Sequence, residues 1–188
     1  MSKLETNTID TVSGTTNLTI GSTNTSTITM PNGKLTGQNY PSFLSTRTST
    51  QTISDETSTT VQFNNVIVDT NSGFNTSTYK YTIPIAGKYY IFTTVQANSP
   101  GNTDGFERMH LKLLKNSDVV IGESYYDQRN NPGMFSTLVI VNNHDLSAND
   151  TIFVQCFVDV TNGGSDPQIQ GEASPKETCS FGAYRLGA

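Results

Sequence analysis

Apolar and polar positions alternate in short runs over most of the chain, and turn-forming residues separate the runs. Eight runs rich in β-branched and aromatic residues occur at 61–69, 79–85, 88–97, 108–115, 119–126, 134–142, 151–160 and 178–186. Such runs with Gly, Asn, Asp and Pro between them are typical of a β-sandwich or barrel. The run at 108–115 also fits a short helix, although Met109, Leu111 and Leu113 alternate as in a strand. The pattern predicts an all-β domain whose last strand ends close to the C-terminus.

Residues 1–40 have a different character, because Thr, Ser and Asn dominate and apolar residues are few. Two alternating pairs, Leu18/Ile20 and Ile28/Met30, repeat at an interval of ten residues. Two repeats are too few for a free-standing solenoid, and the segment cannot bury enough apolar surface to become ordered alone. We interpret it as a short β-rich stalk or anchor that winds against copies of itself or docks on a larger body. The alternative is a flexible tail.

Seven short motifs follow one another in the rest of the chain. They are Pro41-Ser42-Phe43, Val61-Gln62-Phe63-Asn64-Asn65-Val66, Phe74-Asn75 with Tyr81-Thr82-Ile83-Pro84, Gly87-Lys88-Tyr89-Tyr90, Leu113-Leu114-Lys115-Asn116, Leu146-Ser147-Ala148-Asn149-Asp150-Thr151-Ile152 and Phe181-Gly182-Ala183-Tyr184-Arg185-Leu186. Their order resembles that in the globular head of complement component C-one-q and in the wider tumour-necrosis-factor-like jelly rolls. The chain departs from this pattern at Ile91, where the family has Phe, and at Asn149, where it has Gly. The closing glycine, Gly182, comes one position early.

The resemblance implies a jelly-roll sandwich of about ten antiparallel strands over residues 41–188. It also implies a recognition module without catalytic activity that associates as a homotrimer. The hydrophobic fraction of 34% is low for a domain that stands alone, which agrees with association. We expect the trimer interface to be lined by side chains from two strands, with Tyr89, Ile91, Phe181 and Tyr184 as candidates.

The animal members of this family carry collagen stalks and signal peptides, and neither pattern occurs here. The repeats within residues 1–40 instead resemble stalk or anchor segments of phage and other viral fibres. We therefore predict a non-enzymatic virion protein, a trimeric fibre or spike head that attaches to a glycan or protein of the host surface. The alternative is a capsid decoration or stabilising protein. In both, residues 1–40 would bind other virion proteins.

Charge and hydropathy narrow the set of partners. The formal net charge is −5 and the sequence has no Lys/Arg cluster, which argues against nucleic-acid binding. No apolar run approaches the roughly 20 residues that a membrane crossing requires. The N-terminus lacks the apolar core of a secretory signal, so we expect synthesis in a host cytoplasm and localisation in the virion.

Candidate contact residues come from the longer loops, at 99–106 and 125–134. Binding residues are often found on loops held by a rigid scaffold, and Tyr and Arg are frequent anchors of interfaces. The candidates are Phe106, Tyr125, Tyr126 and Arg129. For Tyr125 and Tyr126, the alternative is that they simply form the end of a strand.

The sequence shows no recognisable catalytic or metal-binding pattern. Neither His110 nor His144 has a ligand partner at the usual spacing. Asp104 and Glu107 are loop carboxylates of the type that binds Ca²⁺, but their spacing is not that of an EF-hand, so we expect solvated side chains and no cofactor. Two cysteines, at 156 and 179, lie in strand-like runs, and we expect both to be buried, reduced thiols.

Overall fold

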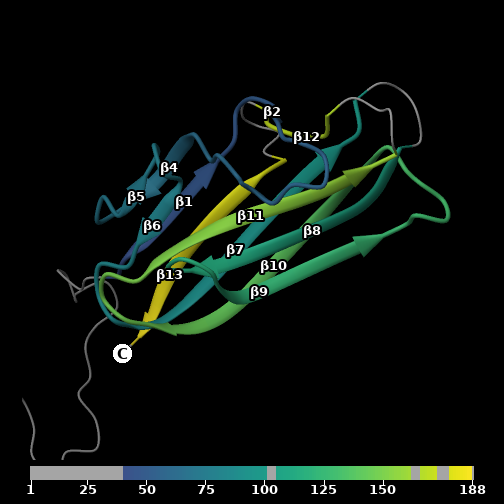
Figure 1. Ribbon diagram of the computed structural model, residues 1–188. Helices are drawn as coiled ribbons and strands as arrows, with labels where there is room; N and C mark the ends of the chain where they lie inside the picture. The colour runs from purple at the N-terminus through teal and green to yellow at the C-terminus, as the bar shows by residue number, and fades with distance from the viewer. Residues whose placement is uncertain (1–39, 101–104, 162–165, 173–177, 188) are drawn as a thin grey trace, which may run out of the picture. The chain divides into compact units, whose positions relative to one another are not determined.

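Two antiparallel β-sheets packed face to face make up the part of the chain that the computed structural model describes, residues 40–100, 105–161, 166–172 and 178–187 (Figure 1). The predicted segment 1–40 lies outside these ranges except for Tyr40. Within them every element is a strand, including 108–115, for which a short helix was the alternative. The predicted all-β jelly-roll sandwich is confirmed.

The first sheet has seven strands in the order β2-β12-β7-β13-β1-β4, with β10 on the other side of β7. These strands are β1 (Ser42–Thr46), β2 (Gln51–Thr52), β4 (Asn65–Asp69), β7 (Gly87–Asn98), β10 (Phe135–Leu146), β12 (Gln168–Ile169) and β13 (Ser180–Gly187). The second sheet has six strands in the order β5-β6-β11-β8-β9, with β3 beside β11. They are β3 (Thr59–Thr60), β5 (Phe74–Asn75), β6 (Lys80–Thr82), β8 (Phe106–Lys115), β9 (Val119–Asp127) and β11 (Thr151–Val160).

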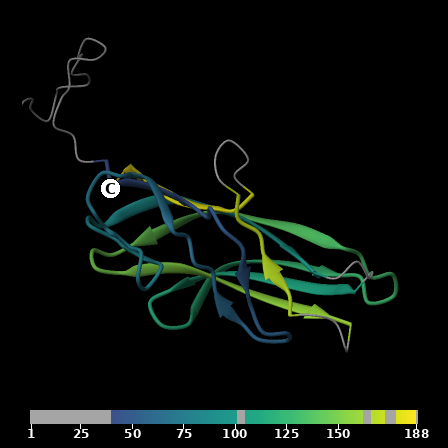
Figure 2. The ribbon, with the colours of Figure 1, turned by 90° about the horizontal axis from the view of Figure 1, so that it is seen from above.

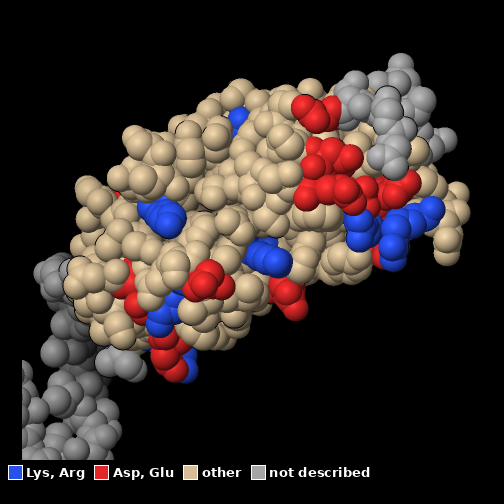
Figure 3. Space-filling model, viewed as in Figure 1, with Lys and Arg blue, Asp and Glu red and all other residues tan. Residues whose placement is uncertain are grey.

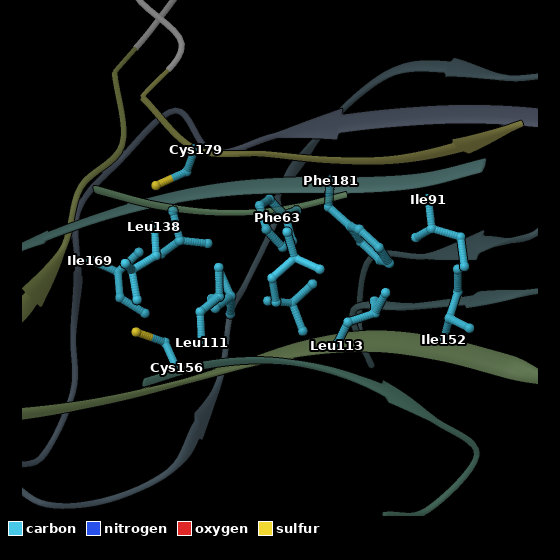
Figure 4. Close-up of a cluster of buried hydrophobic side chains, with 14 of the residues drawn as sticks. Phe63, Ile91, Leu111, Leu113, Leu138, Ile152, Cys156, Ile169, Cys179 and Phe181 are labelled. Atoms are coloured by element: carbon cyan, nitrogen blue, oxygen red, sulfur yellow. The ribbon is translucent and has the colours of Figure 1, made fainter. Parts of the chain in front are cut away.

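Strict alternation along the long strands builds the core between the sheets. In β7, the residues from Tyr89 to Ala97 alternate between buried and half-buried positions, and β8 and β10 show the same period. Figure 4 shows side chains of both sheets meeting between them, with Phe181 and Ile91 on one side and Leu113 and Ile152 on the other. Phe181 is fully buried and contacts the rings of Phe43 and Phe63 at centroid distances of 4.9 and 5.5 Å. Every second side chain of each long strand therefore points into the core. The side chains between them point to the outer face of their sheet.

The two ends of the sandwich differ. β1 begins at Ser42 beside the end of β13, since Ser42 pairs with Tyr184. At the opposite end, β9 finishes at Asp127 and β10 starts at Phe135. Figures 1 and 2 show the C-terminus at one end and the loop between β9 and β10 at the other. The loop predicted to carry contact residues thus lies away from the point where residues 1–39 join the domain.

The turn between β10 and β11 explains one departure from the family pattern. Asn149 has a φ of 71°, which lies in the left-handed region that glycine adopts most easily and asparagine tolerates. The next residue, Asp150, accepts hydrogen bonds from the backbone N–H of Ser147, the side-chain amide of Asn116 and the ammonium group of Lys115. Burial acts to raise the pKa of Asp150, but these donors outweigh it and the pKa is lowered. Asparagine can therefore replace glycine here without loss of the turn.

Candidate functional site

A row of apolar side chains crosses the outer face of the first sheet. Pairing places Val141 of β10 beside Phe92 of β7, Phe92 beside Gly182 of β13, Gly182 beside Leu44 of β1, and Leu44 beside Val68 of β4. Laterally paired residues project from the same face of a sheet. The neighbours of Phe92 along β7 belong to the core, so this row faces outward. We call it the apolar row.

The side chains of the apolar row are accessible in the single chain. Val141 is 54% exposed and Val68 is 42% exposed. Beside the row, Tyr90 and Tyr184 lie on paired positions with ring centroids 5.0 Å apart, and Tyr184 is 42% exposed. Exposed large apolar side chains that join into one patch are typical of an interface with another protein.

Gly182 has a specific role in this row, because the ring of Phe92 occupies the space where a side chain would stand. A Cβ atom at Gly182 would lie 2.5 Å from Cζ of Phe92 and 2.9 Å from the carbonyl oxygen of Phe43. The missing side chain therefore lets Phe92 lie flat across β13. This accounts for a glycine in β13 one position earlier than in the related pattern.

We predict that Gly182→Ala destabilises the domain by about 1–3 kcal/mol, because the added methyl group overpacks against Phe92 and a backbone oxygen. Gly133→Ala is the matched control, since its Cβ would meet no neighbouring atom closer than 3.6 Å. Urea denaturation of the two variants measures the difference. Equal free energies of unfolding for Gly182→Ala and Gly133→Ala would show that the ring of Phe92 adjusts without cost.

Three of the four predicted interface residues lie in the core instead. Tyr89, Ile91 and Phe181 are each 0% exposed, and the hydroxyl of Tyr89 donates a hydrogen bond to the carbonyl oxygen of Ile85 at 2.7 Å. They cannot contact another subunit without opening the sandwich. Only Tyr184 is exposed as expected. The outward side chains of β7 are Tyr90 and Phe92, each one residue away from the predicted Tyr89 and Ile91.

The outer face of the second sheet has a different composition. Pairing of β9, β8 and β11 builds a central row of rings, Tyr125, His110 and Phe157. On one side lies a row of Asp127, Arg108 and Asp159, and on the other a row of Glu123, Lys112 and Gln155. We call this set the aromatic-polar face. Figure 3 shows acidic and basic side chains side by side toward both ends of the described domain, with mostly uncharged surface between them.

Ion pairs hold the charged side chains of the aromatic-polar face in place. Arg108 pairs with Asp159, which is nearly buried, and with Glu56 at 3.3 Å. His110 lies 3.1 Å from a carboxylate oxygen of Glu123, through its Nε2 atom. Buried and multiply bonded pairs of this kind are well ordered in comparison with isolated surface pairs.

Asp127 and Arg129 form a clamp at the start of the loop between β9 and β10. Nε and Nη2 of Arg129 donate hydrogen bonds to the two carboxylate oxygens of Asp127 at 3.0 and 2.7 Å, and the backbone N–H of Arg129 donates at 3.2 Å. The hydroxyl of Tyr125 donates to the same carboxylate at 3.3 Å. The donors from Arg129, the side chain above all, lower the pKa of Asp127 to about 2.

This lowered pKa gives a pH dependence with a definite sign. A carboxyl whose pKa is lower in the folded chain than in the unfolded chain stabilises the folded loop when it is ionised. This stabilisation is complete above the unfolded pKa of about 4, and it is lost as the pH falls from about 4 to about 2. We predict that Arg129→Ala returns the pKa of Asp127 toward its ordinary range. Carbon-detected NMR titration of the carboxyl measures this, and an unchanged titration midpoint would show that the clamp does not persist in solution.

The four predicted contact residues separate into two groups. Phe106 is 0% exposed and belongs to the core, so it cannot be a contact residue. Tyr126 is half-buried and its ring packs against Phe106 at 5.9 Å. In contrast, Tyr125 is 54% exposed and Arg129 has an exposed side chain. Substitution of Tyr126 would therefore test folding, and Tyr125 is the better probe of recognition.

The loop residues 127–131 line an open hollow of about 550 Å³ beside the aromatic-polar face. Its lining consists of polar side chains, Asp127, Gln128, Arg129, Asn130 and Asn131. Sequence reasoning selected this loop but missed His110 and Phe157, which lie on two other strands. No local motif marks those two residues, since only strand register brings them beside Tyr125.

The two carboxylates considered for Ca²⁺ are not brought together by anything the structure describes. Asp104 lies outside the described residues, and Glu107 accepts a hydrogen bond from the hydroxyl of Thr161 at 3.1 Å. Within the described ranges no group of three or more His, Cys, Asp or Glu side chains is placed to hold a metal ion. In the same part of the chain, no helix is long and apolar enough to span a membrane.

Both cysteines are buried free thiols at one end of the core, on opposite sheets (Figure 4). Burial raises the pKa of Cys156 and of Cys179. A raised pKa and burial both suppress thiolate chemistry. We predict that a thiol reagent at about pH 8 leaves the native chain unlabelled and modifies both cysteines in denaturant. Rapid labelling of the native chain would mean that the end of the sandwich opens readily.

The fold agrees with comparisons to known proteins. The family model of the C1q domain matches residues 42–174. Among solved structures, the globular domain of zebrafish complement 1qA protein is 16% identical, with 78% of this chain and 97% of that chain covered and a TM-score of 0.54. Murine APRIL is 12% identical, with 79% and 100% covered and a TM-score of 0.53. No curated protein matches. Identities this low show a shared fold, whereas the family match spans most of the chain, which therefore belongs to the C1q domain family.

Proposed function

We propose that residues 41–188 form the homotrimeric, non-enzymatic head of a virion fibre or spike that attaches to a host surface. C1q-like and tumour-necrosis-factor-like domains typically form homotrimers and generally have no catalytic activity. The observation that carries the trimer is the apolar row, which runs across β10, β7, β13, β1 and β4 on one face. The other two copies of the chain would cover the apolar row.

Covering this face with further copies has a clear physical benefit. Apolar area removed from water contributes about 25 cal/mol per Å² to association. Closed point symmetry buries the same patch in every copy and leaves no patch free for uncontrolled growth. Light scattering and sedimentation of the purified chain at micromolar concentration test this part. A monomeric mass would overturn the proposed trimer.

The virion setting rests on residues 1–40, whose Thr-rich repeats resemble stalk or anchor segments of viral fibres. The head is the attachment end in this proposal, because its β9–β10 loop lies at the end of the sandwich opposite Ser42. Antibodies raised against residues 41–188 should label fibre or spike tips when particles from the source are imaged. Label spread over the capsid would favour a decoration protein instead, and particles without label would remove the virion role.

A further inference from the structure

The aromatic-polar face points away from the apolar row, because the two faces are the outer surfaces of a two-layer sandwich. If further copies cover the first sheet, the second sheet stays accessible in each copy. The hollow at residues 127–131 adjoins Tyr125 through Asp127, which accepts a hydrogen bond from its hydroxyl. This surface is therefore available to a ligand in the assembled head.

We propose that the aromatic-polar face and the adjoining hollow bind a neutral saccharide, with a sugar ring stacked on Tyr125. This inference rests on the proposed recognition function and names the ligand of the same surface. Three features of the described residues carry it, namely an exposed and oriented ring, a polar hollow of suitable size, and arginines that already pair with carboxylates.

The ring of Tyr125 is both exposed and held in place. It is 54% exposed, and it packs against His110 in a T-shaped arrangement with a centroid distance of 5.5 Å and an interplanar angle of 90°. Its hydroxyl donates to Asp127, which the clamp with Arg129 holds. An aromatic ring that is fixed before binding offers contact area at little entropic cost.

The hollow supplies the polar groups that sugar hydroxyls require. Gln128, Asn130 and Asn131 each carry an amide with both donor and acceptor atoms. A volume of about 550 Å³ lies within the range of sites for small organic ligands. A sugar hydroxyl group both donates and accepts hydrogen bonds, which suits side-chain amides better than a cluster of like charges.

The charges of this face argue for a neutral ligand. Arg129 is neutralised by Asp127, Arg108 by Asp159 and Glu56, and His110 lies against Glu123. Among the described residues of this face, Lys112 is the cation without an ion pair, and strand pairing places it beside Glu123. Recognition of a sulfated, phosphorylated or sialylated ligand depends on cations that are free to pair with it. Here an anionic ligand would have to displace carboxylates from both arginines, and beside Lys112 it would meet the carboxylate of Glu123.

The test uses the full chain and host cells to which the particles adsorb. Periodate, at a strength that cleaves the vicinal diols of neutral sugar rings, destroys neutral saccharides, whereas a sialidase removes only anionic sialic acids. We expect periodate treatment of the cells to abolish binding of the unmutated chain and sialidase treatment to leave it. Raising the salt from about 0.05 to 0.5 M should change the affinity by less than about threefold, because no net charge is paired across the contact.

Variants locate the site. Tyr125→Ala should weaken binding by about thirtyfold, the loss expected when an interface anchor is truncated. Val119→Ala is the matched control, since Val119 is also 54% exposed and lies at the other end of β9. It should bind as the unmutated chain does, and both variants should keep the oligomeric mass and the unfolding midpoint of that chain.

The outcomes separate this inference from the proposed function. Binding that survives periodate, is lost after sialidase treatment, falls steeply with salt, or is unaffected by Tyr125→Ala would overturn the neutral saccharide site and leave the head an attachment protein. If the unmutated chain binds no untreated host cells, the proposed attachment function itself fails, and the saccharide inference fails with it.

Discussion

Replacing Val141 by aspartate is expected to dissociate the proposed homotrimer into folded monomers. Val141 stands in the apolar row beside Phe92, where a second copy would remove it from water. Burying a carboxylate without a partner costs several kcal/mol, so the dissociation constant should rise at least about a hundredfold. Sedimentation velocity at micromolar concentration and circular dichroism measure the mass and the fold.

Val119→Asp is the control for this experiment. Val119 and Val141 are both valines that are 54% exposed in the single chain, but Val119 lies in the second sheet, outside the apolar row. The same charge there should leave the trimer intact. A trimer of unchanged mass in Val141→Asp would mean that copies associate through another surface.

Removing the ring of Phe181 is expected to cost about 3–5 kcal/mol of stability, the usual loss for a large aromatic residue in a packed core. Phe181 contacts the rings of Phe43, Phe63 and Phe74, and no part of it is exposed. Phe135, which is 60% exposed, is the matched control, and Phe135→Ala should cost much less. Urea denaturation should use equal protomer concentrations, because association adds to the apparent stability.

The Phe181→Ala experiment also decides between two roles for that residue. If Phe181 were an interface residue, as the sequence suggested, its truncation would release folded monomers with the same urea midpoint as the monomers expected from Val141→Asp. If Phe181 belongs to the core, its truncation lowers the midpoint well below that of those monomers. Only the second result agrees with its position between the two sheets.

Much of the fold could be predicted because strand runs and turns are local features. Runs such as 88–97, 108–115 and 151–160 became strands with nearly the expected bounds. The turn before β11 was also recognisable, although asparagine stands at the left-handed position where the related pattern has glycine. Where runs were broken, as in 61–69, only the second half forms a strand, and Val61 and Phe63 fill the core from an irregular segment.

The candidate surfaces were less predictable. Where every residue of a strand is apolar, the sequence does not say which alternate residues face the core and which face outward. In Tyr89-Tyr90-Ile91-Phe92 both parities are apolar, so a shift of one residue exchanges the core with the interface. For the candidate contact residues, too, the sequence did not say which side chains face inward. Phe106 is the first residue of β8 and points into the core, while Tyr125 points out beside its neighbour Tyr126.

By itself the sequence determined the class of fold, the strand-rich extent of the domain and the family, since these depend on periodicity, turn chemistry and ordered motifs that act locally. The tertiary structure alone decided which side chains form surfaces. Val141, Phe92 and Val68 form one row, and Tyr125, His110 and Phe157 another, only because strands far apart in the chain pair in a particular register. Register depends on how the whole core packs, and no single segment contains that information.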